Sequence, residues 1–487
     1  MASRHYSGNI ITNVDSYKNA HSWMYPEGTQ YVSSYIESRG GIYPAVLFAG
    51  LQPFLREYLM HPITIEDIHE AHDIHTSMGI PFVKQNWIDL INEHDGYLPV
   101  EIEAVPEGTV LPTRNVLLQV VNTDPKYPWV TGFIETALLR SVWYASTVGT
   151  TSWMVKQGIR EYLEKTSDQP ELLRMYLHDY GARGVSSFES AALGGVAHLI
   201  SFDQTDNVSG YIGSKRWYNG AAPNGAAVFQ EHSIVGANGR ENEADSFREL
   251  LANAGGGVVG LLCDTFDHEN AVRNIIGKEL KSEISRFNGL VIARCDSGDP
   301  VMVPVDTVEW LMESYGFETN SKGYRVLPPF LRVIQGDGLT VETYLALYAE
   351  LERRGLATDN ILCGMGGGLL QKINRDSMNF GMKTNAVCIN DTWRDVYKAP
   401  TGNGMKRSKA GRLALTTVDG EFCTVRREDV APEENLLVPV FRNGKILREW
   451  NMSDMIERSE RPTPRSYYAD VVGDTESAAP PGKLRRT

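Results

Sequence analysis

The stretch from Ile361 to Asp376, ILCGMGGGLLQKINRD, decides between the folds open to this chain. It begins as a short apolar run, breaks into five residues of which four are glycine, and resumes as a helical pattern. Glycines in this number give up side-chain packing, so they indicate a special backbone conformation or the close approach of another group. A strand that leads into bare backbone N–H groups at a helix start is suited to binding an anion. The stretch therefore predicts a strand, an anion-binding loop and a helix.

Similar apolar runs recur along the chain from about residue 176. They begin at residues 176, 197, 226, 257, 289, 331, 360 and 385. Most are continuous rather than alternating, as in strands covered on both faces. Helical patterns separate several of them; in 340–355, for example, the apolar side chains fall on one face. Strands alternating with helices predict a parallel sheet closed into a (β/α)8-like barrel, with a doubly wound sheet as the alternative.

The ends of these runs favour the barrel. Polar residues or glycines stand where the strands would give way to loops: Asp203, His232, Asp264, Asp296, Asp337 and Gly364 to Gly368. In a barrel such ends converge on the face that carries the chemistry. Taken singly, an aspartate at a strand end is often only the cap of the next helix. The glycine loop follows the seventh run, where barrels commonly hold phosphate.

The rest of the chain is of another type. Residues 98–123 read as strands joined by turns, and Asp419-Gly420 and Asn443-Gly444 are hairpin signals. These segments predict a smaller α+β domain built from both chain ends. The expected parts are 1–150 and 401–458 for this domain, 151–400 for the barrel, and 459–487 for a loose tail.

Composition excludes several classes of protein. The 487 residues carry a formal net charge of −14, so polyanions would be repelled, and we expect neither nucleic-acid binding nor a membrane-surface role. Residues 1–18 lack a signal-peptide core and no long apolar span occurs, so we expect a cytoplasmic protein. The five cysteines form no CxxC pair. His69, His72 and His75 are spaced as a solvated helix face rather than as a metal site.

One loop in this acidic chain is strongly basic: 398–412 contains Lys398, Lys406, Arg407, Lys409 and Arg412. Such a loop is often merely solvated, but here it is also the strongest local cationic field available to a phosphate. Carboxylates at strand ends, a glycine-rich anion loop and this basic loop together suit a substrate with several phosphates and Mg²⁺. The combination points to phosphosugar or nucleotide chemistry.

Eight segments in the same order resemble one known family. They are DSYKxxHxxxYP (15–26), PVEIxAVPEGxVxPxxNVL (99–117), HDYGxRGVSS (178–187), EHS (231–233), CDSGDP (295–300), LPPxLRVIQGDG (327–338), GMGGGLLQKxxRD (364–376) and KRSKxGRL (406–413). On these motifs the chain resembles the nicotinamide phosphoribosyltransferases, which belong to the type II phosphoribosyltransferases. The resemblance runs from about residue 13 to about residue 455.

The resemblance implies an activity. Members of the family join nicotinamide to 5-phosphoribosyl-1-pyrophosphate with Mg²⁺, giving nicotinamide mononucleotide and pyrophosphate. ATP is implied as a co-substrate that phosphorylates His232, whose ring Asp264 would orient. A homodimer with shared active sites is also implied. The departing pyrophosphate leaves an oxocarbenium-like carbon, so such an enzyme needs cations on the leaving group and the attacking nitrogen held in line.

The resemblance also implies site residues. The reacting groups are expected to be Glu231, His232, Asp264, Arg294 and Asp296. The base site is expected to contain Asp15, Tyr17 of the partner, Tyr180, Arg183 and Asp206, with Asp206 accepting a hydrogen bond from the carboxamide. The phosphoribosyl and phosphate groups are expected at Arg39, Gly336, Asp337, Gly366, Gly367, Arg375, Lys383, Lys398 and Lys406. Mg²⁺ is expected at Asp296 and Asp337, partly through water.

The chain departs from the family pattern at Tyr180, where Phe is expected, and at Ala182, Cys295 and Met365. These departures affect the shape of the base pocket. The same chemistry on nicotinate is the first alternative, although Asp206 would oppose a substrate carboxylate. A catalytically silent barrel with a binding or signalling role is a second alternative. A Schiff-base aldolase would need a lysine at a strand end, and none of the later runs ends in one.

Overall fold

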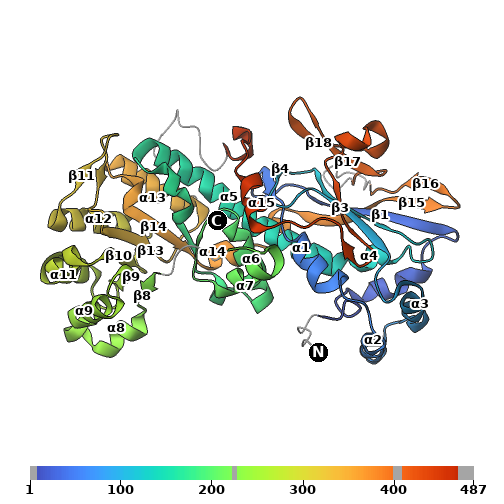
Figure 1. Ribbon diagram of the computed structural model, residues 1–487, viewed down its shortest axis with the longest axis horizontal. Coiled ribbons are helices and arrows are strands. Elements are labelled where there is room, and N and C mark those ends of the chain that lie inside the picture. Colours follow the sequence, from blue (N-terminus) through green and yellow to red (C-terminus); the bar gives the residue numbers. More distant parts are fainter. Residues whose placement is uncertain (1–7, 222–226, 399–407, 470–487) are drawn as a thin grey trace, which may run out of the picture. The chain divides into compact units, whose positions relative to one another are not determined.

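The computed structural model describes residues 8–221, 227–398 and 408–469. Within these ranges the chain forms two compact units, each built around its own seven-stranded sheet (Figure 1). Unit 1 takes its described residues from 1–150, 212–221 and 373–463. Unit 2 takes its described residues from 151–211, 222–372 and 464–487. Residues 373–398, which the sequence suggested for the barrel, therefore lie in unit 1.

The sheet of unit 1 is antiparallel and runs in the order β16, β15, β1, β5, β3, β19, β20. In that order the strands span Thr392–Asp395, Phe380–Ile389, Thr29–Ser38, Val116–Asn122, Val100–Ala104, Val438–Arg442 and Lys445–Ile446. A further pair joins β2 (Ala45–Leu47) to β4 (Val110–Pro112). The sheet thus joins early and late segments, and residues 98–123 form strands as predicted.

Both hairpin predictions are confirmed. β17 (Leu413–Val418) pairs with β18 (Glu421–Arg426) across Asp419 and Gly420, and β19 pairs with β20 across Asn443 and Gly444. The four turn residues have φ values of 52°, 83°, 47° and 81°, respectively. Two consecutive residues with positive φ match the twist of the flanking strands, and this is why Asn or Asp followed by Gly stands there.

The helices of unit 1 are α1, α2, α3, α4 and α15, which span Leu51–Phe54, Ile65–Ser77, Lys84–His94, Val130–Phe133 and Met452–Ser459. The long helix α5 (Glu135–Thr166) contains the boundary between the units. On α2, His72 contacts Asp73 at the surface, while His75 is buried and stacks on Phe82. The burial of His75 departs from the solvated helix face that the spacing of the three histidines predicts.

The sheet of unit 2 is entirely parallel and runs in the order β7, β6, β14, β13, β10, β9, β8. In that order the strands span Gln204–Thr205, Leu177–Asp179, Ile361–Met365, Leu331–Gln335, Gly289–Cys295, Gly257–Leu262 and Val228–Phe229. The last of these strands along the chain, β14, pairs with the first, β6, and β7 and β8 form the two edges of the sheet. Unit 2 is therefore an α/β unit with a parallel half-barrel sheet.

Two of the eight predicted barrel strands are wrong. The run at 197 is the end of α6 (Phe188–Leu199), which reads as a continuous apolar run because nearly all of its residues are buried. The run at 385 belongs to β15, in the antiparallel sheet of unit 1. In place of the run at 197 the structure has the two-residue strand β7, too short to give a hydrophobic signal.

Helices connect the strands of unit 2. Helix α7 (Val208–Tyr218) crosses the boundary between the units. Helices α8 to α14 span His232–Asn238, Glu243–Ala254, His268–Asn270, Lys281–Arg286, Met302–Tyr315, Val341–Arg353 and Gly367–Leu370. A short hairpin joins β11 (Glu318–Thr319) to β12 (Arg325–Val326). The predicted helix at 340–355 is confirmed as α13. No helix in the described ranges is long and apolar enough to cross a membrane.

Candidate active site

The carboxyl ends of the parallel strands bring the predicted residues of unit 2 to one edge. Asp296 follows the last residue of β10, and Gly336 and Asp337 follow the last residue of β13. Tyr180 follows β6, and Asp206 follows β7. Parallel strands end at the same edge of a sheet, so side chains from strands far apart in sequence gather there.

Arg294 is the central cation of this edge. Its guanidinium donates to Asp296 Oδ1, at 2.9 Å from Nη2 and 3.3 Å from Nε, and both side chains are mostly buried. Nη1 lies 3.4 Å from the Gln230 carbonyl oxygen, and the guanidinium carbon lies 5.7 Å from the Tyr180 ring and 5.9 Å from that of Phe229. Arg294 thus ties together residues from the ends of β6, β8 and β10. Sequence reasoning missed Phe229, which carried no chemical signal.

Gly364 explains the position of Tyr180. An added Cβ at Gly364 would collide with the Tyr180 ring, so the first glycine of the loop provides room for an aromatic side chain rather than for an anion. The Tyr180 N–H donates to the Met365 carbonyl at 2.9 Å and so attaches the β6 loop to β14. At Gly367, an added Cβ would meet no atom within 4 Å, so the third glycine faces open space. The glycines of the loop therefore have different functions.

Asp179, which the sequence did not single out, holds the two loops of the base site. It is fully buried, and its carboxylate accepts from the Gly181 N–H at 2.7 Å and from Asn207 Nδ2 at 2.9 Å. Its carbonyl accepts from the Asp206 N–H at 3.1 Å. Burial raises the pKa of Asp179, and His198 and the two hydrogen bonds oppose this shift. The sequence does not show this burial, so only the structure identifies Asp179.

The positive charges of Arg294 and Arg183 act on the Asp206 carboxylate. The Asp206 side chain retains contact with solvent, but burial among neighbouring groups raises its pKa, an effect that Arg294 and then Arg183 oppose. Arg183 lies in the turn Ala182–Gly184 directly after the Tyr180 loop and is exposed. A carboxylate between two guanidinium groups is suited to accepting hydrogen bonds from a neutral donor.

His232 begins α8 and lies beside Asp264. His232 Nε2 is 3.3 Å from Asp264 Oδ1; the histidine side chain is 53% exposed, whereas the aspartate is 5% exposed. Glu231, the residue before the helix, accepts a hydrogen bond from Ser233 Oγ. Asp264 Oδ1 has no hydrogen-bond partner among the described residues, so His232 lies beside this oxygen without a hydrogen bond to it.

Asp296 and Asp337 fit the expected site for Mg²⁺. They follow adjacent strands, and carboxylate oxygens are the ligands that this hard cation prefers. Gly336 lies between them: a Cβ placed on it would be 2.5 Å from Asp296 Oδ1 and would fill the space beside this oxygen. The Asp337 side chain is exposed, while its carbonyl accepts from Gln335 Nε2 at 2.7 Å. Both carboxylates would coordinate the ion, and Asp296 would then give up part of its hydrogen bonding with Arg294.

Unit 1 brings together four basic side chains, Lys18, Arg39, Arg375 and Lys383. A Cβ placed on Gly381 would lie 3.2 Å from Arg39 Nη2 and 3.8 Å from Lys383 Nζ. Burial lowers the pKa of Lys383, and the charges of the other three act in the same direction, whereas Glu135 opposes them. Lys18 and Arg375 form ion pairs with Glu135 and Asp376, so Arg39 and Lys383 are the two cations that the geometry places together. Sequence reasoning found three of them and missed Lys18.

The remaining predicted residues of unit 1 lie on its surface. Tyr17 is 59% exposed, and Lys18 Nζ lies 5.2 Å from its ring centroid. Asp15 Oδ2 accepts a hydrogen bond from Thr136 Oγ1 at 2.7 Å. Lys398 is exposed, and its main chain makes two hydrogen bonds with Ser408. Lys406 lies outside the described residues.

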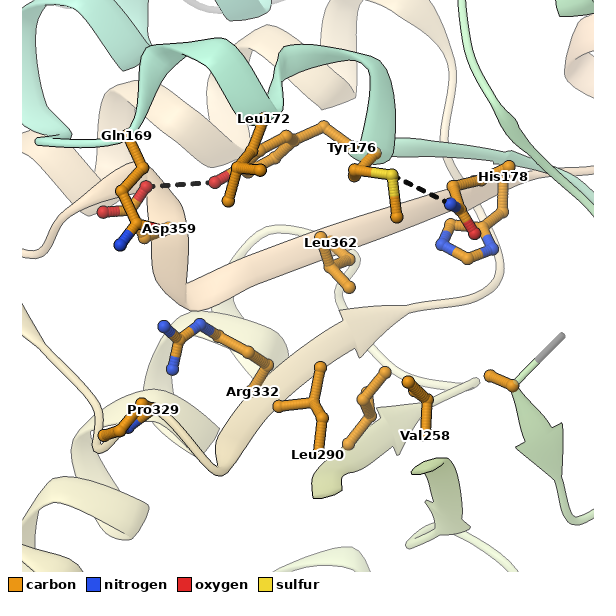
Figure 2. Close-up of a pocket in the computed structure, with 14 residues that line it drawn as sticks. Gln169, Leu172, Tyr176, His178, Val258, Leu290, Pro329, Arg332, Asp359 and Leu362 are labelled. Atoms are coloured by element: carbon orange, nitrogen blue, oxygen red, sulfur yellow. Dashed lines mark hydrogen bonds between the residues drawn. The ribbon is translucent and has the colours of Figure 1, made fainter. Parts of the chain in front are cut away.

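A separate cavity of about 360 Å³ lies among the amino ends of the same strands (Figure 2). Val258, Leu290, Arg332 and Leu362, each the second residue of its strand, line it together with His178. None of the predicted site residues lines this cavity. The largely buried His178 has its pKa lowered to about 3 by burial, so it is neutral there.

Known proteins resemble the chain along nearly its whole length. Residues 175–445 match the nicotinate phosphoribosyltransferase (NAPRTase) family, and residues 9–102 match the nicotinamide phosphoribosyltransferase N-terminal domain. The chain belongs to the nicotinate phosphoribosyltransferase family. Within it, a Xanthomonas campestris protein named nicotinamide phosphoribosyltransferase is 42% identical over 93% of this chain and 98% of its own length. A protein of the same name from Acinetobacter baylyi is 30% identical over 92% of this chain and 97% of its own length.

Solved structures agree on the fold. Nicotinate-nucleotide pyrophosphorylase from Pyrococcus furiosus superposes with a TM-score of 0.59 at 15% identity and covers 95% of this chain and 96% of its own. Human nicotinic acid phosphoribosyltransferase superposes with a TM-score of 0.56 at 16% identity and covers 93% of this chain and 95% of its own. Identities this low show the fold alone, which is that of the type II phosphoribosyltransferases.

The different functions of Gly364 and Gly367 can be separated by mutation. We expect Gly364→Ala to lower the melting temperature and to weaken base binding, because the new methyl group displaces the Tyr180 ring. Gly367→Ala should keep the wild-type melting temperature, since its methyl group enters open space. Calorimetric melting of both variants checks this expectation. Equal melting temperatures for the two would show that Gly364 does not support Tyr180.

Proposed function

We propose that this family member is a nicotinamide phosphoribosyltransferase, a pentosyltransferase of NAD salvage. It converts nicotinamide and 5-phosphoribosyl-1-pyrophosphate to nicotinamide mononucleotide and pyrophosphate. The observation that carries the proposal is the near-complete match to two proteins of that name, at 42% and 30% identity. The placement of Tyr180, Asp206, Arg294 and Asp296 at one edge of the parallel sheet supports it.

At the base end of the site, Tyr180 supplies an aromatic face and Asp206 an acceptor. The Asp206 carboxylate would accept a hydrogen bond from the carboxamide NH₂ of nicotinamide. Nicotinate would instead place its own carboxylate against Asp206, and two like charges in a partly desolvated site repel each other. Burial raises the pKa of Asp206, and the charges of Arg294 and Arg183 oppose this shift. This arrangement selects the amide over the acid.

At the phosphoribosyl end, positive groups favour departure of pyrophosphate. The bond between ribose C1 and the pyrophosphate oxygen breaks, its electron pair leaves with the oxygen, and the pyridine nitrogen forms the new bond to C1. Arg294 and the N–H groups of Gly366 and Gly367 would stabilise the phosphate charges. Mg²⁺ held by Asp296 and Asp337 would neutralise charge on the leaving group. We assign Arg39, Arg375, Lys383, Lys398 and Lys406 to substrate phosphates as well.

Asp206→Asn tests the choice of base. A hydrogen bond to a charged group contributes roughly 1.5–3 kcal/mol, so the variant should lose about tenfold to a hundredfold of its preference for nicotinamide over nicotinate. The measurement is kcat/KM for each base. Asp73→Asn, an exposed aspartate on α2, is the matched control and should keep the wild-type ratio. An unchanged ratio in Asp206→Asn would remove this residue from the base site.

We further propose that ATP hydrolysis is coupled to the transfer through His232. Asp264, which lies beside Nε2, would orient the ring, and the Nδ1 lone pair would attack the γ-phosphorus of ATP and release ADP. Water would later hydrolyse the phosphohistidine to inorganic phosphate. The contact between Nε2 and a buried carboxylate, together with the exposure of the ring, supports this assignment. Hydrolysis would drive the equilibrium toward the mononucleotide.

The phosphohistidine is tested by incubation with γ-labelled ATP. Wild type should acquire an acid-labile label, and His232→Ala should acquire none while still transferring phosphoribose slowly without stimulation by ATP. His72→Ala, an exposed histidine on α2, serves as the control and should be labelled like wild type. A label that persists in His232→Ala would show that the phosphoryl group resides elsewhere.

A homodimer with shared active sites is also part of the proposal. Tyr17, Trp23 and Met24 of unit 1 are large apolar side chains with 59%, 59% and 58% exposure, and a second copy would cover them. Tyr17 would then stack on the base in the partner's site.

We also propose that the sheet of unit 2 belongs to a (β/α)8-like barrel and that the reaction takes place in the cytoplasm.

A further inference from the structure

The cavity of Figure 2 and the candidate site lie on the same face of the unit 2 sheet. Near the amino ends of β8, β9, β10, β14, β6 and β7, the cavity is lined in that order by Ala227, Val258, Ile292, Leu362, His178 and Gln204. Two residues farther along each of these segments stand, in the same order, Phe229, Gly260, Arg294, Gly364, Tyr180 and Asp206. Residues two apart on an extended strand point to the same face. The site is therefore a second layer of residues beside the cavity, toward the carboxyl ends.

Two aromatic rings cover two glycines in this second layer. A Cβ placed on Gly260 would collide with the Phe229 ring, as one on Gly364 would collide with the Tyr180 ring. Gly260 is the partner of Phe229 in the pairing of β8 with β9, so the Phe229 ring extends over the neighbouring strand. The Arg294 guanidinium carbon lies 5.9 Å from the centroid of Phe229 and 5.7 Å from that of Tyr180. The two rings and the guanidinium thus lie close together between the cavity and the edge of the sheet.

The Phe229 ring reaches across the sheet face. Its strand, β8, is one edge of the sheet, yet the ring meets the His178 ring of β6 edge-on, with 6.5 Å between the centroids. His178 lines the cavity, and β6 is the neighbour of β7, the strand that Asp206 follows. Phe229 is half-buried, so part of its ring is accessible to a bound molecule. The ring therefore covers the cavity on the side of the site.

We propose that Phe229 is a specificity-determining residue whose ring closes the inner end of the base site and limits the accepted base to a single-ring amide. The inference rests on the proposed function. Gln204, two residues before Asp206, lines the cavity, so a substituent on an amide nitrogen held at Asp206 would extend toward this space. The cavity of about 360 Å³ has room for an aromatic ring, because a cavity of about 150 Å³ already binds benzene. Phe229 blocks the entry of such a group.

Phe229→Ala tests this proposal with N-benzylnicotinamide, which keeps one N–H for Asp206 and adds an apolar ring. Its Kd, measured by calorimetry, should be roughly tenfold to a hundredfold lower for the variant than for wild type, as expected for the burial of one aromatic ring. The Kd for nicotinamide should change much less, because nicotinamide does not reach the cavity. Phe229→Leu retains apolar packing and should shift the Kd for N-benzylnicotinamide in the same direction by a smaller factor, so it tests the proposal even if Phe229→Ala does not fold.

Val258→Phe is the control that locates the added ring. Val258 lines the cavity and is 36% exposed, so a larger side chain there can fill the cavity from its amino end. Alone, Val258→Phe should keep the wild-type kcat/KM for nicotinamide. Combined with Phe229→Ala, it should abolish the tighter binding of N-benzylnicotinamide. A general loosening of the base site by Phe229→Ala would instead persist in the double variant.

The outcomes are distinct. Tighter binding of N-benzylnicotinamide that Val258→Phe abolishes supports the proposal. An equal Kd in wild type and in both Phe229 variants, or tighter binding that persists when the cavity is filled, overturns it while the proposed function stands. A wild-type protein that does not convert nicotinamide overturns the proposed function, and this inference with it.

Discussion

The parallel register of the strands in unit 2 determines which residues can act together. Cys295 pairs with Gln335 between β10 and β13, and Met365 pairs with Asp179 between β14 and β6. Asp179 in turn pairs with Thr205 of β7. The residues that follow these partners therefore emerge at the same edge, although more than a hundred positions separate some of them in sequence. A shift of one residue in any pair would turn a reacting side chain toward the other face of the sheet.

Arg294 turns this edge into a site for anions. It is largely buried, so its charge must be balanced locally, and Asp296 provides the balance through two hydrogen bonds. Burying one member of such a pair alone would be strongly unfavourable. Under the proposed function, a substrate phosphate would pair with Arg294, because the site already contains both charges in a fixed geometry. This preorganisation is what a reaction that separates pyrophosphate from an oxocarbenium-like carbon needs.

Much of this site could be predicted from the sequence, because strand ends and glycine loops leave local signals. The positions of Asp296 and Asp337 after their strands follow from apolar runs that end in polar residues, whereas Tyr180 and Asp206 were expected from the family resemblance. The run at 197 was misleading, since a helix buried on all sides has the same continuous pattern as a buried strand. The run at 385 is a true strand, but its antiparallel pairing with β1 depends on residues more than 300 positions away.

Other features of the site depend on three-dimensional contacts that no local pattern encodes. Gly364 resembles its neighbouring glycines in sequence, yet it is the Tyr180 ring that excludes a side chain there. The importance of Asp179 comes from its burial, and Lys18 joins Arg39 and Lys383 only through the fold of unit 1.

The central claim, a phosphoribosyl transfer specific for the amide, is tested most directly by comparing three bases. Purified full-length protein is incubated with nicotinamide, nicotinate or quinolinate, each with 5-phosphoribosyl-1-pyrophosphate and Mg²⁺, with and without ATP. The mononucleotide products are then quantified by mass. The account predicts that nicotinamide mononucleotide forms fastest and that ATP increases its yield. Faster formation of nicotinate mononucleotide would contradict the assignment of Asp206 and with it the proposed function.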